Sequence, residues 1–281
     1  MSGKLYLCAT PIGNLEDITL RVLRVLKEVD LIAAEDTRNS IKLLNHFDIK
    51  TPMTSYHEYN KVEKAYTLIE KMQEGLNVAL ITDAGTPGIS DPGEVLAAMC
   101  YDAGIEVTSL PGPAACITAL TLSGLSTRRF AFEAFLPPDK KERKAILEEL
   151  KNETRTMIFY EAPHKLYATL RDMLDAWGDR RIAIVRELTK IHEEVIRTTL
   201  SEAVQRSKDD PFKGEIVLVI EGATAPAAEA YTLEEAVALA KEKLEQGLAP
   251  SEAAKQAAAE SGLAKRDIYR AILHDGGGAD D

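Results

Sequence analysis

Residues 82–93 read TDAGTPGISDPG and are the most informative stretch of the sequence. They follow an apolar, β-branched run at residues 77–82 (NVALIT), which is typical of a buried strand. Their three Gly and two Pro predict a shaped loop, because helix and strand interiors tolerate these residues poorly. In an open parallel sheet, ligands bind beyond the carboxyl ends of the strands. We therefore interpret this central loop as a ligand-contacting loop. The alternative is a tight strand-to-helix connection in which Pro92 begins the next helix.

Strands and helices alternate around this loop from residue 4 to residue 122. Apolar runs predict the strands, and apolar residues at helical spacing predict the helices. The alternation predicts a parallel sheet with helices on both faces. Strands are expected at residues 4–9, 30–34, 53–56, 77–82 and 105–110, and helices at 18–29, 37–47, 59–74, 92–103 and 113–122.

The pattern breaks at residues 123–129 (SGLSTRR), which are polar and contain Gly. We place a domain boundary here, with an N-terminal α/β domain at residues 1–124 and a second α/β domain at 125–223. Strands outnumber helices in the second domain, so a mixed sheet is expected. Residues 222–230 (GATAPAAEA) are predicted to be a linker. Three helical patterns in residues 231–275 resemble a helix-turn-helix module.

The composition is that of a soluble globular protein, with 45% hydrophobic and 28% charged residues. No apolar run approaches the roughly 20 residues that span a bilayer, and no signal peptide precedes the first strand. We therefore expect a cytoplasmic protein without a membrane partner. Three widely spaced Cys and five His without an HExxH pattern predict neither disulfides nor a metal site. The net charge of −11 argues against broad nucleic-acid binding but leaves room for a local basic surface.

Four loops follow the predicted strands of the first domain, at residues 10–14, 35–38, 82–93 and 111–115. In a parallel sheet these loops converge on one edge, and residues 160–164 and 220–222 end strands of the second domain. A pocket between the domains is therefore expected. The first strand lacks a following GxGxxG, and the chain lacks GxxxxGK[ST], which argues against dinucleotide and P-loop sites. Because few Lys or Arg occur in these loops, a nucleotide-like ligand without phosphate fits better than ATP or NAD.

Eight motifs occur in order along the chain: ATPIGNLEDITLR, AAEDTR, ITDAGTPGISDPG, LPGPAA, FLPP, FYEAPH, RELTK and GEIVLVIEG. Over residues 4–223 the chain thereby resembles the ribosomal RNA small subunit methyltransferase I family, which belongs to the tetrapyrrole-methylase-like (class III) methyltransferases. Porphyrin-methylating relatives usually carry a Gly-rich GxGPGDP in the first loop, where this chain has ATPIGN. This difference favours RNA over a tetrapyrrole as the substrate.

The resemblance implies two α/β domains of the tetrapyrrole methylase type, with the cofactor in the cleft between them, and a small C-terminal helical module that contacts RNA. It also implies a homodimer that uses S-adenosylmethionine to methylate the ribose 2′-hydroxyl of a cytidine in 16S ribosomal RNA of the small subunit. Residues 160–162, with Glu221 and Gly222, would hold the adenosine. The cofactor-binding residues carried over by position are Pro11, Asp83, Ala84, Gly85, Pro87, Pro111, Gly112, Pro113, Ala114, Ala115, Tyr160, Glu161, Ala162, Glu221 and Gly222.

Transfer of a methyl group to a hydroxyl needs alignment of the two groups and loss of a proton. The catalytic candidates are Glu35, His57 and Lys190, and Glu161 is a further possible proton acceptor. Each has an alternative role. Glu35 caps a helix or forms an ion pair, His57 is a surface loop residue, Glu161 orients backbone, and Lys190 binds phosphate or pairs with Glu187. The sequence does not choose between them.

RNA contact requires positive charge. The alternative for basic clusters is a solvated helix face, which is favoured at residues 140–144 because acidic residues lie close by. Tyr269 beside two Arg favours the C-terminal module. Two other functions remain open: methylation of a tetrapyrrole, and RNA binding without catalysis, for which a cofactor pocket would be unnecessary. The RNA-binding candidates are Arg38, Arg128, Arg129, Lys265, Arg266 and Arg270.

Overall fold

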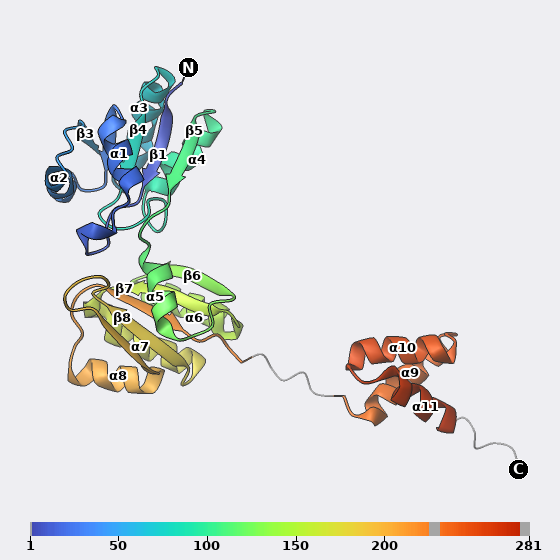
Figure 1. The fold of residues 1–281 in the computed structure, drawn as a ribbon. Helices are drawn as coiled ribbons and strands as arrows, with labels where there is room; N and C mark the ends of the chain where they lie inside the picture. Colours follow the sequence, from blue (N-terminus) through green and yellow to red (C-terminus); the bar gives the residue numbers. More distant parts are fainter. Residues whose placement is uncertain (1, 225–230, 276–281) are drawn as a thin grey trace, which may run out of the picture. The chain divides into compact units, whose positions relative to one another are not determined.

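The computed structural model describes residues 2–224 and 231–275 (Figure 1). The chain divides into two units, Met1–Ala223 and Thr224–Asp281. The predicted linker falls mostly on residues 225–230, which lie outside the described residues. No helix within the described ranges is long and apolar enough to cross a membrane.

The first sheet is parallel throughout, as predicted. Its strands lie in the order β3 (Met53–Ser55), β2 (Leu31–Ala34), β4 (Val78–Ile81), β1 (Lys4–Cys8) and β5 (Glu106–Leu110). The strand that precedes the central loop therefore lies beside the first strand of the chain. The connecting helices are α1 (Leu20–Glu28), α2 (Thr37–His46), α3 (Lys61–Gln73) and α4 (Gly93–Asp102), with a short 3₁₀ turn, η1 (Leu15–Asp17).

Alternate residues of the central strand β4 face two different helical layers. Val78 and Leu80 belong to the core with α3 and α4, whereas Ala79 and Ile81 belong to the core with α1 and α2. All four are buried, as expected for a parallel strand covered on both faces. The sheet is therefore a rigid support for the loops at its carboxyl edge.

The second sheet is mixed, which confirms the prediction. Its strands lie in the order β6 (Phe130–Phe135), β7 (Thr156–Glu161), β10 (Ile216–Ile220), β8 (Arg181–Arg186) and β9 (Glu194–Thr199). Only the pairing of β6 with β7 is parallel among these described strands. One face packs against α6 (Lys140–Glu149), α7 (Pro163–Trp177) and α8 (Leu200–Asp209), and the turn η2 (Leu150–Asn152) follows α6.

The other face of this sheet is covered by α5 (Ala115–Ser123), although its sequence lies in the predicted first domain. Ala119 and Leu120 of α5 share a core with Ile158 and Ala183 of the sheet. Ile12 from the first loop joins the same core. The domain boundary at residue 124 stays a prediction, and the packing of α5 and Ile12 links the two sheets within one unit.

Residues 231–275 form helices in the three predicted places: α9 (Leu233–Glu245), α10 (Pro250–Ser261) and α11 (Lys265–Asp275). Small side chains such as Ala240 and Ala254 let these helices approach, and Ile268 and Ile272 of α11 fill the core between them. A capping box of Thr232 and Glu235 begins α9. This unit therefore has its own small core.

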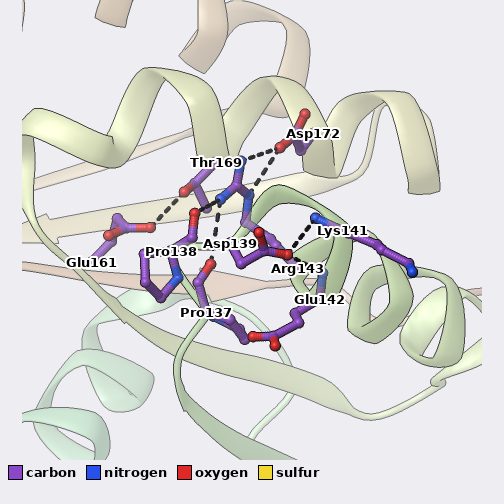
Figure 2. Close-up of polar contacts among 9 residues, drawn as sticks. All are labelled: Pro137, Pro138, Asp139, Lys141, Glu142, Arg143, Glu161, Thr169 and Asp172. Carbon is purple, nitrogen blue, oxygen red and sulfur yellow. Dashed lines mark hydrogen bonds and ion pairs between the residues drawn. The ribbon is translucent and has the colours of Figure 1, made fainter.

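A buried ion pair joins α6 to α7 (Figure 2). Arg143 donates from Nε and Nη2 to Oδ2 of Asp172, at 2.9 and 2.7 Å. The two side chains are 12% and 4% exposed. Arg143 Nη1 also donates to the carbonyl oxygens of Pro137 and Pro138, at 3.3 and 3.1 Å. One guanidinium therefore ties two helices to the loop that follows β6.

Replacement of Asp172 tests the importance of this pair. Asp172→Asn leaves the Arg143 cation buried without its counter-charge, so the free energy of unfolding should fall by about 3 kcal/mol, as for other broken buried pairs. Urea denaturation measures this change. Glu28→Gln is the matched control, because its pair with Arg24 is exposed and contributes only about 0.5 kcal/mol or less. Equal losses in the two variants would show that burial of the pair is unimportant.

Candidate functional site

The carboxylate of Asp91 shapes the central loop. It accepts hydrogen bonds from the backbone N–H groups of Gly88 at 3.0 and 2.9 Å, Ile89 at 3.1 Å and Gly93 at 2.7 Å. Ser90 within this turn has a φ of 65°, which is uncommon for a residue with a side chain. Hydrogen bonds to an ionised acceptor are strong, and they stabilise this conformation. Asp91 therefore has a structural role in the loop.

The central loop contacts the first loop and the segment before α5. Thr10 and Gly85 exchange two backbone hydrogen bonds, at 2.9 and 3.0 Å. Gly85 has a φ of 85°, which favours Gly at this position. Thr86 Oγ1 donates to the carbonyl oxygen of Pro113 at 2.9 Å, and the Asp83 N–H donates to Oε2 of Glu35 at 3.3 Å. The predicted convergence of the four loops at one edge of the sheet is thus confirmed.

Residues from both sheets line a cavity of about 430 Å³. Its volume is that of a typical small-molecule site. Loops that follow the parallel strands of the first sheet form one wall. The carboxyl ends of β6, β7 and β8 and the beginning of β10 form the other. The first wall contains Ile12, Glu35, residues 82–86, residues 89–91, Ala114 and Ala115, and the second contains Phe135, residues 160–163, Val185, Leu188 and residues 214–217.

The cavity lining is acidic, and none of its described residues is Lys, Arg or His. Three of its five carboxylates are compensated: Asp91 by loop N–H groups, Glu161 as described below, and Glu215 by an ion pair. Glu35 and Asp83 form no ion pair in the described part of the chain, although Asp83 Oδ2 accepts from Asn39 Nδ2 at 3.2 Å and its charge acts on nearby Arg38. A cavity with this charge favours a cationic ligand and disfavours phosphates.

Glu161 is buried and its carboxylate is fully engaged. Oε1 accepts from the N–H of Ala162 at 2.8 Å, and Oε2 accepts from Oγ1 of Thr169 at 2.5 Å. These bonds hold the turn between β7 and α7. The geometry agrees with the alternative role for Glu161, the orientation of backbone at the cavity wall.

Glu35 has a perturbed acidity. Burial raises the pKa of its carboxyl group above the ordinary value, the hydrogen bond from the Asp83 N–H opposes this rise, and the negative charges of Asp83, Asp91 and Asp36 add to it. A carboxylate with a raised pKa is a better proton acceptor than an ordinary one. Of the predicted catalytic residues Glu35, His57 and Lys190, only Glu35 lines the cavity.

Lys190 and His57 lie outside the lining. Lys190 Nζ contacts Oε1 of Glu187 at 3.0 Å and Oε2 of Glu215 at 3.1 Å. Burial lowers the pKa of Lys190, but these two bonds and the charges of both carboxylates outweigh it and raise the pKa, so the amine stays protonated. The N–H of His57 donates to Asn60 Oδ1 at 2.8 Å, and its Nδ1 is buried without a partner among the described residues.

The predicted cofactor-binding positions fall into three groups: those that line the cavity, those that lie close to lining residues in the chain, and Glu221 with Gly222, which lie elsewhere. Pro11, Pro87, Pro111, Gly112 and Pro113 flank the cavity without lining it. Gly112 packs so closely that a Cβ there would lie 2.6 Å from Cβ of Ala9. The lining positions are Asp83, Ala84, Gly85, Ala114, Ala115, Tyr160, Glu161 and Ala162.

Glu221 and Gly222 are not brought to the cavity. Strand β10 runs antiparallel to β7, with Ile216 opposite Glu161 and Ile220 opposite Met157. The beginning of β10 therefore reaches the cavity, and its end lies at the opposite edge of the sheet. There the carboxylate of Glu221 pairs with Arg181, with contacts of 2.5 and 3.0 Å.

Residues 214–217 occupy the cavity wall instead. The sequence does not point to them, because the rule of carboxyl strand ends holds for parallel strands and β10 is antiparallel. Phe135, Val185 and Leu188 also line the cavity without having been predicted. The motif FLPP begins with Phe135, and RELTK contains Leu188 and directly follows Val185, so these motifs were the available signal.

The predicted RNA-binding residues are exposed. Arg38 donates to the Asp36 carboxylate, with Nη2 to Oδ2 at 2.7 Å. Hydrogen bonds from the Arg38 side chain and backbone lower the pKa of Asp36 to about 2. Arg128 and Arg129 lie between α5 and β6 and form no ion pair within the described residues.

The other three predicted RNA-binding residues lie on α11 in the C-terminal unit. Lys265 Nζ donates to Ser251 Oγ at 3.0 Å, and Arg266 lies 3.5 Å from the carboxylate of Asp267. Arg270 is exposed one turn after Arg266. These exposed cations can reach a partner without the loss of a buried contact.

Comparison with known protein families gives a match over most of the chain. The model of the tetrapyrrole (corrin/porphyrin) methylases matches residues 4–204. A protein of Halalkalibacterium halodurans called ribosomal RNA small subunit methyltransferase I is 49% identical over 275 residues, which cover 97% of this chain and 95% of that protein. A Synechocystis protein of the same name is 47% identical over 272 residues, with 96% and 98% covered.

Solved structures share the fold at low sequence identity. Uroporphyrin-III-C-methyltransferase from Thermus thermophilus gives a TM-score of 0.56 at 21% identity, with 77% of this chain and 94% of that chain covered. Diphthine synthase gives 0.61 at 15% identity, with 79% and 91% covered. The predicted fold type is therefore confirmed. From its two sheets, its family match and its relatives at 47–49% identity, this chain belongs to the tetrapyrrole (corrin/porphyrin) methylase family, together with the proteins called ribosomal RNA small subunit methyltransferase I.

Proposed function

We propose that this protein is an S-adenosylmethionine-dependent methyltransferase that methylates the ribose 2′-hydroxyl of a cytidine in 16S ribosomal RNA. Relatives with nearly half of their residues identical are called ribosomal RNA small subunit methyltransferase I, which supports the substrate class. The observation that carries the cofactor assignment is the acidic cavity without a lining cation. S-Adenosylmethionine contains a nucleoside without phosphate and a positive sulfonium, and both properties fit this cavity.

The two walls suit different parts of such a ligand. Asp83 and Glu35 supply negative charge on the first wall, and no Lys, Arg or His is among the described lining residues. Ala114 and Ala115 lie at the beginning of α5, where the positive end of the helix dipole favours a carboxylate. Apolar side chains of the second wall, including Val185, suit a nucleoside. When bound, the cofactor supplies an electrophilic methyl group.

We assign acceptance of the hydroxyl proton to Glu35. Of Glu35, His57 and Lys190, it is the residue that lines the cavity, and its carboxylate forms no ion pair within the described residues. Its raised pKa brings its basicity closer to the working pH. Lys190 is a poor candidate for a base, because two carboxylates keep its amine protonated. It serves better to hold Glu187 and Glu215 in place.

The proposal includes the small ribosomal subunit as the substrate particle and a homodimeric enzyme, which rest on the family resemblance, and a cytoplasmic location, which rests on the sequence pattern. The net charge of −11 requires that contact with RNA phosphates be local. Arg128 and Arg129 are suited to this role because their charges are unpaired within the described residues. Lys265, Arg266 and Arg270 of α11 offer a second basic surface.

The proposed reaction is tested on small ribosomal subunits from cells that lack this protein. Incubation with the purified protein and methyl-labelled S-adenosylmethionine should place label in 2′-O-methylcytidine after digestion of the RNA. Chromatography of the nucleosides identifies the labelled product. Label in another nucleoside would show that the proposed site of transfer is wrong. Binding of the cofactor without any labelled RNA would refute the proposal of a ribosomal substrate.

The charge argument predicts the ligand preference of the cavity. Asp83→Asn should weaken binding of S-adenosylmethionine more than binding of S-adenosylhomocysteine, because only the former carries a sulfonium charge. The ratio of the two Kd values should change by about 5-fold, equivalent to about 1 kcal/mol for one partly solvated charge pair. Isothermal titration calorimetry measures both values. Asp102→Asn, an exposed change outside the cavity, should leave the ratio unaltered, and an unaltered ratio in Asp83→Asn would refute the argument.

The assignment of Glu35 predicts a defect in turnover with a characteristic pH dependence. Glu35→Gln should reduce kcat by about 100-fold or more, the usual contribution of a general base. Because the unprotonated carboxylate is the active form, kcat/KM should rise with pH through the raised pKa of Glu35, at a higher pH than for an ordinary Glu.

Glu35→Gln should lack this rising limb, whereas Glu94→Gln, an exposed change on α4, should retain it. Stopped-flow or quench measurements across the pH range, together with cofactor Kd values, separate turnover from binding. A Glu35→Gln enzyme with the normal rate and the normal pH profile would exclude Glu35 as the base.

A further inference from the structure

Phe135 is an exposed aromatic residue in the cavity wall. It ends β6 and lines the cavity, although 56% of its surface remains exposed. Ile89 of the central loop is the other large apolar lining residue with high exposure, at 46%, in the described part of the wall. Both therefore lie where the cavity opens to solvent. Of the two, only Phe135 has an aromatic ring, which can stack on a planar ligand.

The backbone of β6 is distorted just before this ring. The register of β6 against β7 shifts between Phe132 and Ala134, and Ala134 has a φ of 54°. A β-bulge redirects the side chains that follow it, and bulges are frequent next to active sites. Strain of this kind persists only where the surrounding structure holds it. After the shift, Phe135 pairs with Tyr160, and the two rings meet edge to face at 5.5 Å.

Hydrogen bonds from a buried, charged arginine fix the segment that follows Phe135. Arg143 donates to the carbonyl oxygens of Pro137 and Pro138, and Asp172 fixes the guanidinium (Figure 2). The two Pro residues also have restricted φ. The path of the chain around the exposed ring is therefore determined by a buried ion pair and two rigid residues.

The same helix also fixes the neighbouring part of the wall. Thr169 lies one turn before Asp172 on α7 and donates to the carboxylate of Glu161, beside Tyr160 (Figure 2). Tyr160 itself is held by a hydrogen bond from the N–H of Cys116 to its hydroxyl oxygen, at 3.2 Å. Neighbouring interactions thus fix the positions of both Phe135 and Tyr160, and Phe135 is the more exposed of the two.

We propose that Phe135 is the residue on which the base of the target nucleotide stacks. This inference rests on the proposed function. The target nucleotide enters from solvent and first meets the accessible Phe135 ring at the opening of the cavity. The less exposed Tyr160 ring is then left to contact the cofactor. The acidic lining disfavours contacts with phosphate, so affinity for the nucleotide must come from an uncharged group. Stacking on an aromatic ring provides it and requires an unpaired base, which is the usual target of RNA-binding proteins.

Three variants test the role of the ring. Phe135→Leu keeps an apolar side chain but removes the aromatic face, and kcat/KM for unmethylated small subunits should fall by about 10-fold, as for the loss of one stacked base. Phe135→Tyr keeps the aromatic face and should retain the wild-type kcat/KM. Phe130→Leu is the matched control, because Phe130 begins the same strand, is 39% exposed and does not line the cavity. The Kd for S-adenosylmethionine should be unchanged in all three.

Two results would overturn the proposal. An unchanged kcat/KM in Phe135→Leu would exclude stacking on this ring. A Kd for S-adenosylmethionine that weakens in parallel with transfer would assign the ring to the cofactor. Failure of the proposed function is distinguishable from both, because it appears as absence of methyl transfer by the wild-type protein, and it would remove this inference as well.

Discussion

The geometry of the site depends on the carboxylate of Asp91. By accepting hydrogen bonds from the N–H groups of Gly88, Ile89 and Gly93, it folds the chain back between β4 and α4. This turn lets the preceding residues of the loop meet Thr10 and Pro113. The loops that follow β1, β4 and β5 thereby contact one another, and together they form one wall of the cavity.

Electrostatic compensation separates the carboxylates of the site into two kinds. Asp91 and Glu161 are satisfied by hydrogen-bond donors, and their charges are used within the protein. Glu35 and Asp83 each accept a single hydrogen bond and form no ion pair among the described residues, and burial together with neighbouring charges raises the pKa of Glu35. The same two groups can therefore attract a cationic ligand and accept a proton. The chemistry of the cavity rests on this difference.

Much of the site was predictable from local sequence, and the rest depends on two tertiary features, the direction of one strand and a change of register in another. The loop residues Asp83 to Gly85 and the pair Ala114 and Ala115 follow parallel strands, and all of them line the cavity. Glu221 and Gly222 also follow an apolar run, yet β10 is antiparallel to its neighbours and carries them to the opposite edge. Phe135 was missed because its orientation depends on a bulge, and strand patterns do not reveal a change in register.

The local sequence was enough to identify which segments become strands and helices, because apolar spacing, Gly, Pro and capping residues act over a few neighbouring positions. It also determined that acidic and Gly-rich loops follow the parallel strands. Tertiary contacts were needed to show that α5 covers the second sheet and that Lys190 is neutralised by Glu187 and Glu215. Strand direction, register and the pairing of charges join segments far apart in the chain, and no local pattern encodes which distant partner each segment meets.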